Sequence, residues 1–291
     1  MKKDTNQNEG VIDAKNETET AVAVVETGAV SAQQVNVAGV SLRFPFVRVG
    51  QAMSQWRCNG KAPIVGDFYI GKDKQINVHL AEMGQDAGLN VILLDVVPGI
   101  MEDKPFTGAA NPPQRWIGPN AEAEAAEAGF NLTPVPTGEV WADTGRPKMR
   151  ANASRFCYLQ MLVPVPEDFD AVDFQVFPIG EKLYTPARIE FSKGAFKGLS
   201  EVIGNIERME KFRNRKVEGY EFSWRGKVCH VYTAEAVSKQ TGATYPLLKF
   251  SLAMNGGKTV ELDTQEREDF TMFLASVTST TMDIGEDTPE F

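Results

Sequence analysis

Hydrophobic and polar residues alternate along several short segments of this chain, which is the pattern of β-strands that bury one face. In residues 43–49 basic and apolar side chains alternate, and Pro45 restricts this strand to a sheet edge or a strand start. Residues 220–224 and 228–232 flank an Arg-Gly-Lys turn, which predicts a β-hairpin. Further strands are predicted at residues 66–70, 90–97, 156–165, 188–191, 245–254 and 259–262.

Two longer segments have helical spacing instead. Residues 194–212 repeat apolar positions at steps of three and four, which predicts an amphipathic helix. Residues 264–276 follow Asp263, and Glu266 lies three residues after it, which is the spacing of a capping box. We therefore expect the second helix to begin directly after Asp263.

The stretch from Pro98 to Pro147 is dense in proline and glycine, which predicts a long loop that is functional or mobile. An alanine- and glutamate-rich piece, residues 121–128, interrupts it and predicts a short exposed helix that ends at Gly129. Many short strands with a few helices indicate a β-rich α+β fold. We expect an enlarged barrel of the oligonucleotide-binding (OB) type or a related antiparallel sheet.

Composition separates the chain into three parts. Residues 1–40 contain no aromatic residue and are predicted to form a disordered N-terminal arm. Residues 41–278 are predicted to form the β-rich core domain, with the Pro/Gly-rich insertion at about residues 98–150. Residues 279–291 form an acidic C-terminal tail.

The first residues are followed by polar and acidic residues rather than by the apolar stretch of a signal peptide. No run of about 18 apolar residues occurs that would span a membrane. Cys58, Cys157 and Cys229 are odd in number and far apart, which is not typical of a disulfide framework. These features predict a cytoplasmic protein with reduced thiols and no membrane partner.

The net charge of −9 argues at first against nucleic acid as a partner, but the charge is unevenly distributed. Residues 1–40 carry −3 and residues 261–291 carry −8, which leaves +2 for residues 41–260. The acidity is therefore terminal, and the core is close to neutral with basic segments of its own.

Two of these segments, residues 41–61 and 188–227, combine cations with aromatic residues. The first holds four basic residues and no acid, and the second holds ten basic residues against six acids. Cations neutralise phosphates and aromatic faces stack on bases for about 1–3 kcal/mol each, so this combination suits single-stranded nucleic acid. The candidate nucleic-acid-binding residues are Arg43, Arg48, Trp56, Arg57, Lys61, Lys193, Lys197, Lys211, Arg213, Arg215, Lys216, Tyr220, Phe222, Trp224, Arg225 and Lys227.

The same residues also have a purely structural interpretation. Aromatic residues at alternating strand positions commonly belong to the core. Cations such as those in residues 211–216 commonly lie at a solvated helix end, where they also favour the helix dipole.

The chain ends on a polar and acidic segment whose last residue is Phe291. A terminal Phe with its carboxylate, preceded by acids, can dock in an apolar pocket rimmed by cations. This ending resembles that of bacterial and bacteriophage single-stranded DNA-binding proteins, on the residues Asp283, Glu286, Asp287, Pro289, Glu290 and Phe291. The tails of that family recruit replication proteins, so the resemblance implies replication or recombination partners bound by Asp283, Glu286, Asp287, Glu290 and Phe291. Gly285 and Thr288 depart from the family pattern, because they make this tail less acidic.

Motifs for catalysis or metal binding do not compete with this hypothesis. Residues 257–259 match the end of a phosphate-binding loop, but Leu252 stands where its first glycine would be. His79 and His230 have no second ligand at metal-binding spacing. We therefore expect a protein without enzymatic activity, metal or cofactor.

Together these features predict a single-stranded DNA-binding protein of replication or recombination, of bacteriophage type and located in the host cytoplasm. Its acidic tail would recruit partners, and the formation of homo-oligomers is left open. The alternative is a virion structural or assembly protein, or a regulatory inhibitor, without nucleic-acid binding. In that case the arms would become ordered on assembly and the basic segments would contact acidic protein partners.

Overall fold

A computed structural model of the protein describes residues 42, 44–52, 54, 56–71, 77–104, 113–166, 169, 174–192, 194–238 and 242–277. Contacts separate residues 1–30 from residues 31–291, and every described residue belongs to the second unit. The predicted N-terminal arm and acidic tail lie outside the described residues, as do Arg43 and Lys193.

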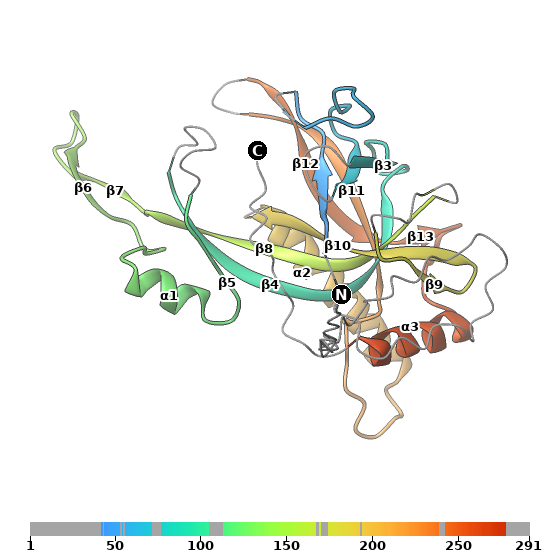
Figure 1. Ribbon diagram of the computed structural model, residues 1–291. Coiled ribbons are helices and arrows are strands. Elements are labelled where there is room, and N and C mark those ends of the chain that lie inside the picture. Colours follow the sequence, from blue (N-terminus) through green and yellow to red (C-terminus); the bar gives the residue numbers. More distant parts are fainter. Residues whose placement is uncertain are drawn as a thin grey trace, which may run out of the picture. The chain divides into compact units, whose positions relative to one another are not determined.

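The described part of the chain is rich in strands and contains the helices α1 (Ala121–Glu127), α2 (Gly194–Arg213) and α3 (Thr264–Ser276) (Figure 1). The strands are β1 (Phe46–Val49), β2 (Phe68–Gly71), β3 (Asn77–Ala81), β4 (Leu89–Glu102), β5 (Arg115–Ile117), β6 (Val135–Val140), β7 (Pro147–Arg150), β8 (Ala153–Pro164), β9 (Phe177–Ile179), β10 (Lys182–Ser192), β11 (Val228–Val237), β12 (Thr244–Leu252), β13 (Met254–Asn255) and β14 (Lys258–Thr259). The predicted β-rich α+β class is thereby confirmed.

One large sheet contains ten of these strands, in the order β12-β11-β4-β8-β10-β1-β2-β3, with β5 paired to β4 and β9 paired to β10. Its pairings are antiparallel, except that β1 runs parallel to β10. The path ends at β12 and at β3, so the sheet of the described residues is not closed into a barrel. Two small hairpins, β6–β7 and β13–β14, are separate from it.

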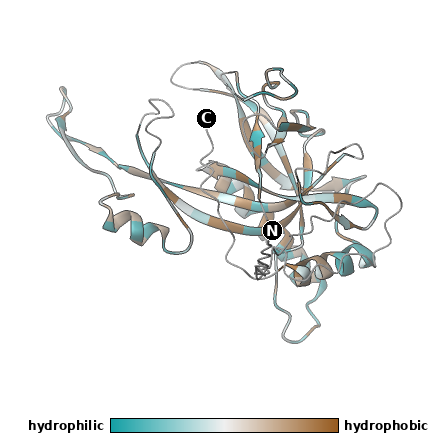
Figure 2. Cartoon of the chain, in the orientation of Figure 1, coloured by the Kyte–Doolittle hydropathy of each residue, from teal (hydrophilic) through white to brown (hydrophobic). Residues whose placement is uncertain are grey.

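The long strands β4 and β8 divide their side chains between the two faces of the sheet, as the pleat of a strand requires. Leu159 and Met161 of β8 are fully buried on one face, where α2 covers them with its apolar positions Leu199, Val202 and Ile206. The predicted amphipathic helix is thus confirmed. Figure 2 shows many hydrophobic residues along these central strands.

The opposite face of the sheet is covered at one end by α3. Phe270 and Phe273 of α3 pack with Ile92 and Leu162 of the central strands. The helix begins after Asp263, as its spacing predicted, and both hydrogen bonds of the capping box are present.

The hairpin predicted around residues 225–227 is wrong. Residues 220–224 form no strand, and β11 pairs instead with β12 and with β4. The local turn signal was outweighed because Phe222 and Trp224 pack against the core beside α2, while the N–H of Gly226 donates to the carbonyl of Leu93.

The long loop predicted from Pro98 to Pro147 is also wrong. This stretch contains the end of β4, all of β5, α1 and β6, and the first residue of β7. Gly99 is a packing residue of β4 here, because a methyl group at its Cα would lie 2.4 Å from Cζ of Phe156. The glycine therefore reflects a close approach of a neighbouring ring and not a turn.

Replacing Asp263 by Ala should lower the free energy of unfolding by about 1 kcal/mol, because it removes the acceptor for the N–H of Glu266. Asp263→Asn should be nearly neutral, since Asn caps about as well as Asp. Urea unfolding of the two variants measures the difference. Equal losses in both variants would show that the carboxylate charge, and not the cap, stabilises α3.

Candidate nucleic-acid interface

The sheet face opposite α2 carries arginine and aromatic side chains beside the part that α3 covers. We call this set the arginine–aromatic face. It consists of Phe46 and Arg48 from β1, Trp56 from the following loop, Tyr69 from β2, Arg115 from β5, Phe156 and Tyr158 from β8, and Arg188 from β10.

Strand register places these residues together. Arg188 lies opposite Gln160 of β8 and opposite Phe46 of β1. Its neighbours Ala187 and Ile189 point to the other face and into the core. Alternation along β10 therefore directs Arg188 and Glu190 toward this face.

Arg188 is held between two aromatic rings. Its guanidinium carbon lies 4.1 Å from the ring centroid of Phe46 and 5.2 Å from that of Tyr158. Only 5% of the residue is exposed, and such cation–π contacts are stronger where water is excluded.

A second buried arginine, Arg115, connects β5 with β10 and β8. Its Nη1 donates to the carboxylate of Glu190 and, at 3.0 Å, to the hydroxyl of Tyr158. Burial works to lower the pKa of Arg115, but Glu190 and Tyr158 outweigh it and raise this pKa. Burial raises the pKa of Tyr158, and Glu190 adds to the effect while Arg115 and Arg188 oppose it.

At the other end of the face, aromatic rings continue toward β3. Arg48 lies 6.0 Å from the ring centroid of Trp56, and Trp56 meets Tyr69 edge to face at 5.0 Å. Tyr69 in turn lies 5.1 Å from His79, which pairs with Asp67 at 3.0 Å.

Charges of both signs lie on and beside this face. Asp95 pairs with Arg225 and Glu190 with Arg115, while Asp67 contacts Nε2 of His79. Arg48 and Arg188 lie on the neighbouring strands β1 and β10.

Gln160 supplies an unusual polar group at the centre of the face. Its register neighbours are Arg188 on β10 and Asp95 on β4. The residue is 2% exposed, and its Oε1 is buried without a hydrogen-bond partner. Such an orphaned acceptor is rare in folded proteins and marks a place where a ligand can donate.

The first basic segment of the sequence contributes only part of its predicted residues to this face. Arg48 and Trp56 belong to it, although Trp56 is only 6% exposed. Arg57 donates instead to the backbone carbonyls of Ser54 and Trp56, and the exposed Lys61 lies in a tight turn with Cys58.

The second basic segment lies mostly on and after α2, which packs on the opposite side of the sheet. Ion pairs join Lys197 to Glu201, Lys211 to Glu207, and Arg213 to Glu210 and Glu261. Arg215 lies over the ring of Phe212, and Lys216 is exposed.

The remaining predicted residues lie after the C-terminal end of α2. Tyr220 and Lys227 both contact the carboxylate of Glu210, while Phe222 and Trp224 pack against the core. Of the predicted residues that the structure describes in this segment, Arg225 alone approaches the arginine–aromatic face, through Asp95; Arg188, which lies on the face, was not among the predicted residues.

Sequence reasoning did not select Phe46, Arg115, Phe156, Tyr158 or Arg188 as site residues. Arg115 lies in the stretch interpreted as a loop, and Phe156 and Tyr158 lie in a strand whose only polar side chain among residues 156–163 is Gln160, apart from the Tyr158 hydroxyl and the Cys157 thiol. The available signal was the pair of charged residues, Arg188 and Glu190, at alternating positions of the predicted strand 188–191.

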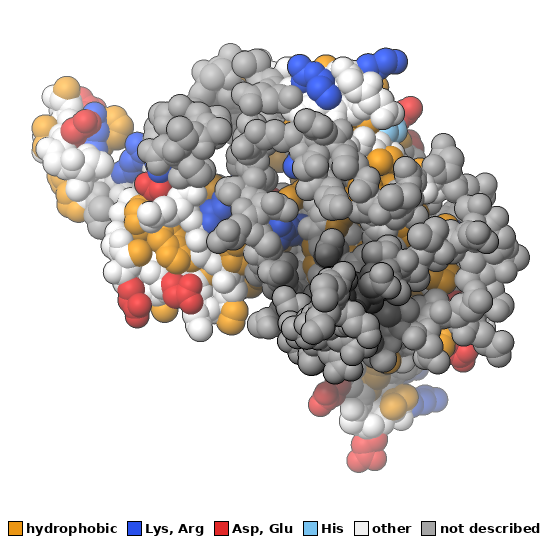
Figure 3. All heavy atoms as spheres, in the orientation of Figure 1, with side chains coloured by type: hydrophobic (Ala, Val, Ile, Leu, Met, Phe, Trp, Pro, Cys, Tyr) orange, Lys and Arg blue, Asp and Glu red, His pale blue; other side chains and the backbone are white. Residues whose placement is uncertain are grey.

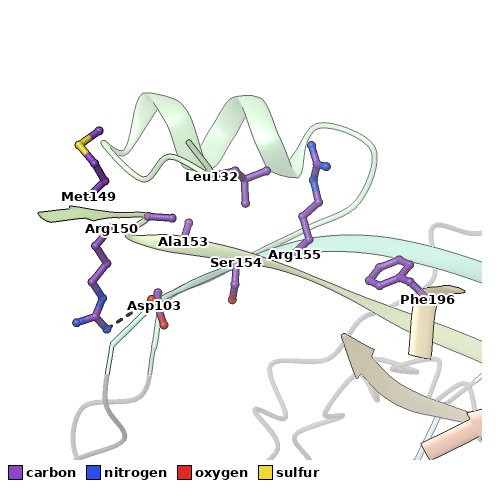
Figure 4. A pocket seen from close by; sticks show the side chains of 9 residues that line it. Asp103, Leu132, Met149, Arg150, Ala153, Ser154, Arg155 and Phe196 are labelled. Atoms are coloured by element: carbon purple, nitrogen blue, oxygen red, sulfur yellow. Dashed lines mark hydrogen bonds and ion pairs between the residues drawn. The ribbon is translucent and has the colours of Figure 1, made fainter. Parts of the chain in front are cut away.

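Two hollows accompany the described surface. The larger, of about 710 Å³, lies along the end of β7 and the start of β8, and Arg150, Arg155 and Asp103 are among its lining residues (Figure 4). Figure 4 shows Arg150 directed at Asp103, and Arg155 on the side of α1, where it pairs with Glu122.

The smaller hollow, of about 310 Å³, lies between α2, α3 and residues 225–228. Its cations Arg213 and Lys227 are already paired with Glu261 and Glu210. Arg115 of the arginine–aromatic face is likewise paired, with Glu190, but there aromatic rings lie against the arginines as well, and we take that face as the candidate site.

Comparisons of the chain with models of protein families, with curated proteins and with solved structures each found no match. Of the helices that the structure describes, none combines the length and apolar character needed to cross a membrane. No group of three or more His, Cys, Asp or Glu side chains is placed to hold a metal ion within the described ranges. The function must be inferred from the geometry of the arginine–aromatic face.

Tyr158→Phe should change how stability depends on alkaline pH. Because the pKa of Tyr158 is raised above 10.0 in the folded protein, ionisation is easier in the unfolded chain, and its contribution to stability is lost as the pH rises above 10. The wild type should therefore lose stability relative to Tyr158→Phe between about pH 8 and about pH 11, measured by urea unfolding at both values. A difference that does not change with pH would contradict this, since other ionising groups cancel between the two proteins.

Proposed function

We propose that the protein binds single-stranded DNA on the arginine–aromatic face. The observation that carries the proposal is the convergence of Arg48, Arg115 and Arg188 with the rings of Phe46 and Tyr158 on one face of an open antiparallel sheet. Guanidinium groups bind phosphates with two parallel hydrogen bonds, and aromatic rings stack on bases of any sequence.

The chemistry of the face suits a flexible strand better than a duplex. Strands β8, β10 and β1 are neighbours in the sheet, and Arg115 of β5 reaches the hydroxyl of Tyr158 on β8, so a strand crossing them would meet rings and cations in turn. Gln160 Oε1 adds an acceptor for an N–H of an unpaired base. In a duplex these base edges are already paired.

We also propose a functional likeness to the OB type. OB folds bind oligonucleotides on one face of a curved sheet, and here the proposed face belongs to an open sheet. The proposal requires that the face opens to the ligand, because Arg188 and Tyr158 are 5% and 3% exposed.

The acidic tail has two roles in this proposal. Phe291 and its preceding acids would recruit replication or recombination proteins, as the resemblance implies. The negative charge of residues 279–291 would also compete with DNA for the arginines, which moderates binding.

The assembly-protein alternative has one observation in its favour. The path of the large sheet ends at β12 and β3, and exposed strand edges can pair with another chain. Native mass measurement separates the two hypotheses, because a large closed assembly without nucleic acid would favour the alternative.

The double variant Arg48→Gln and Arg188→Gln should bind a labelled strand of about 30 nucleotides at least roughly ten-fold more weakly, by fluorescence anisotropy. The slope of log K against log salt should fall by about 0.7 for each phosphate that the variant no longer neutralises. The matched control, Lys197→Gln with Lys216→Gln, removes two exposed cations on and after α2 and should change binding little.

Because Arg188 is buried, the stability of the double variant must be checked by urea unfolding, and Arg188→Lys should retain part of the binding. Equal weakening in both double variants would show that only overall charge matters. Absence of binding by the wild type at low salt, with and without the tail, would refute the proposed function.

Deletion of residues 279–291 should tighten DNA binding, because it removes a competing negative segment, and should abolish recruitment of partner proteins. Anisotropy with the same strand measures the first effect, and pull-down with candidate replication proteins measures the second. Weaker DNA binding after the deletion would contradict the role of the tail.

A further inference from the structure

The β6–β7 hairpin is separate from the large sheet and lies beyond the ends of β4 and β8, next to α1 (Figure 1). Three large apolar residues are exposed on it: Val140 at 58%, Trp141 at 55% and Met149 at 53%. Clusters of exposed apolar residues indicate interaction sites in soluble domains, and an exposed tryptophan in such a cluster supports this interpretation.

The tip of this hairpin holds Trp141 in a defined place. The N–H of Trp141 donates to the carbonyl of Arg146, and the N–H of Gly145 donates to the carbonyl of Trp141, both at 2.8 Å. Gly145 has a φ of 62°, which only glycine adopts without strain, so the turn depends on it. Trp141 is therefore a fixed platform on a closed turn.

Charged residues of both signs lie around Trp141. Lys148 Nζ lies 5.4 Å from the ring centroid of Trp141 and 2.9 Å from Oε2 of Glu139. Arg146, Arg150 and Asp143 lie on the same hairpin, and Figure 3 shows hydrophobic, basic and acidic side chains next to one another at its end.

We propose that the hairpin is a second, distal contact for single-stranded DNA, with Trp141 stacking on a base and Lys148 and Arg146 binding nearby phosphates. This inference rests on the proposed function and extends it to a long binding site. Exposed aromatic rings flanked by cations are the combination that holds single strands without regard to sequence.

The separation of the two contacts sets the length of strand that can cover both. Residues 148–158 span about 30 Å if extended at roughly 3.3 Å per residue, so a strand of a few nucleotides cannot cover both contacts. A strand several times longer can.

A protein partner would also bury Trp141, since tryptophan and arginine are frequent in protein interfaces. The observations favour DNA, because Lys148 lies over the ring of Trp141 and Arg146 forms no ion pair among the described residues. A phosphate would give Arg146 an anionic partner, which an apolar protein surface does not.

The test compares Trp141→Ala in the full-length chain with Phe212→Ala, by anisotropy with oligothymidylates of about 8 and about 30 nucleotides. Phe212 is a matched control: it is 69% exposed and has a guanidinium, that of Arg215, 5.0 Å from its ring centroid, but it lies on α2. Trp141→Ala should weaken binding of the long strand roughly 5- to 150-fold, the loss of one base stack, and leave the short strand within about two-fold. Phe212→Ala should change neither, and Trp141→Phe should retain most of the long-strand affinity.

The outcomes separate this inference from the proposed function. If the wild type binds neither strand, the proposed function itself fails. If it binds both and Trp141→Ala binds them equally well, or weakens both alike, the distal contact is refuted while the central face stands. A Trp141-dependent self-association in native mass spectra, with unchanged DNA binding, would likewise overturn the inference and assign the hairpin to a second copy of the chain.

Discussion

The antiparallel pairing of β4 with β8 is the constraint on which the rest of this structure depends. It runs from Ile92 opposite Leu162 to Glu102 opposite Ala153, and its pleat decides which side chains face α2 and which face away. A bulge between Leu93 and Asp95 inserts one extra residue. Because of it, Leu94 packs in the α3 cluster while Asp95 lies opposite Gln160. Both the apolar core and the polar face follow from this one register.

The burial of Arg115 and Arg188 has an unfavourable desolvation free energy. Removing a guanidinium from water is unfavourable unless carboxylates, aromatic rings or ligands replace the lost solvation. Glu190 and Tyr158 do so for Arg115, and the rings of Phe46 and Tyr158 lie against Arg188. Within the proposed function, these arginines bind the phosphates of the DNA strand.

Negative and positive charges are concentrated in different parts of the chain. The sequence has a pI of about 5.0, yet its acidity lies mainly in residues 1–40 and 261–291, and arginines from β1, β5 and β10 lie on the arginine–aromatic face. Within the proposed function, the same chain therefore carries both a site for an anion and a segment that can compete for it. The exposed Trp141 hairpin would extend the proposed site away from the large sheet.

Local chemistry was sufficient to predict the elements whose signals lie within a few residues of one another: the α+β class, the amphipathic helix α2 and the capping box at Asp263. It failed where a distant partner decides the outcome. Gly99 resembles a turn residue in the sequence, but in the structure the ring of Phe156 lies beside it. Residues 220–224 resemble a strand, but β12 is the strand that pairs with β11.

The residues of the candidate site also separate into those with a local signal in the sequence and those without one. Arg48 and Trp56 could be selected because charge and aromatic content are visible in one short segment, whereas Arg115, Tyr158 and Arg188 come from three segments that only strand register brings together. Sequence alone thus determined composition, charge and local periodicity, while the tertiary structure decided which residues meet, because pairing energy in a sheet depends on residues far apart in the chain.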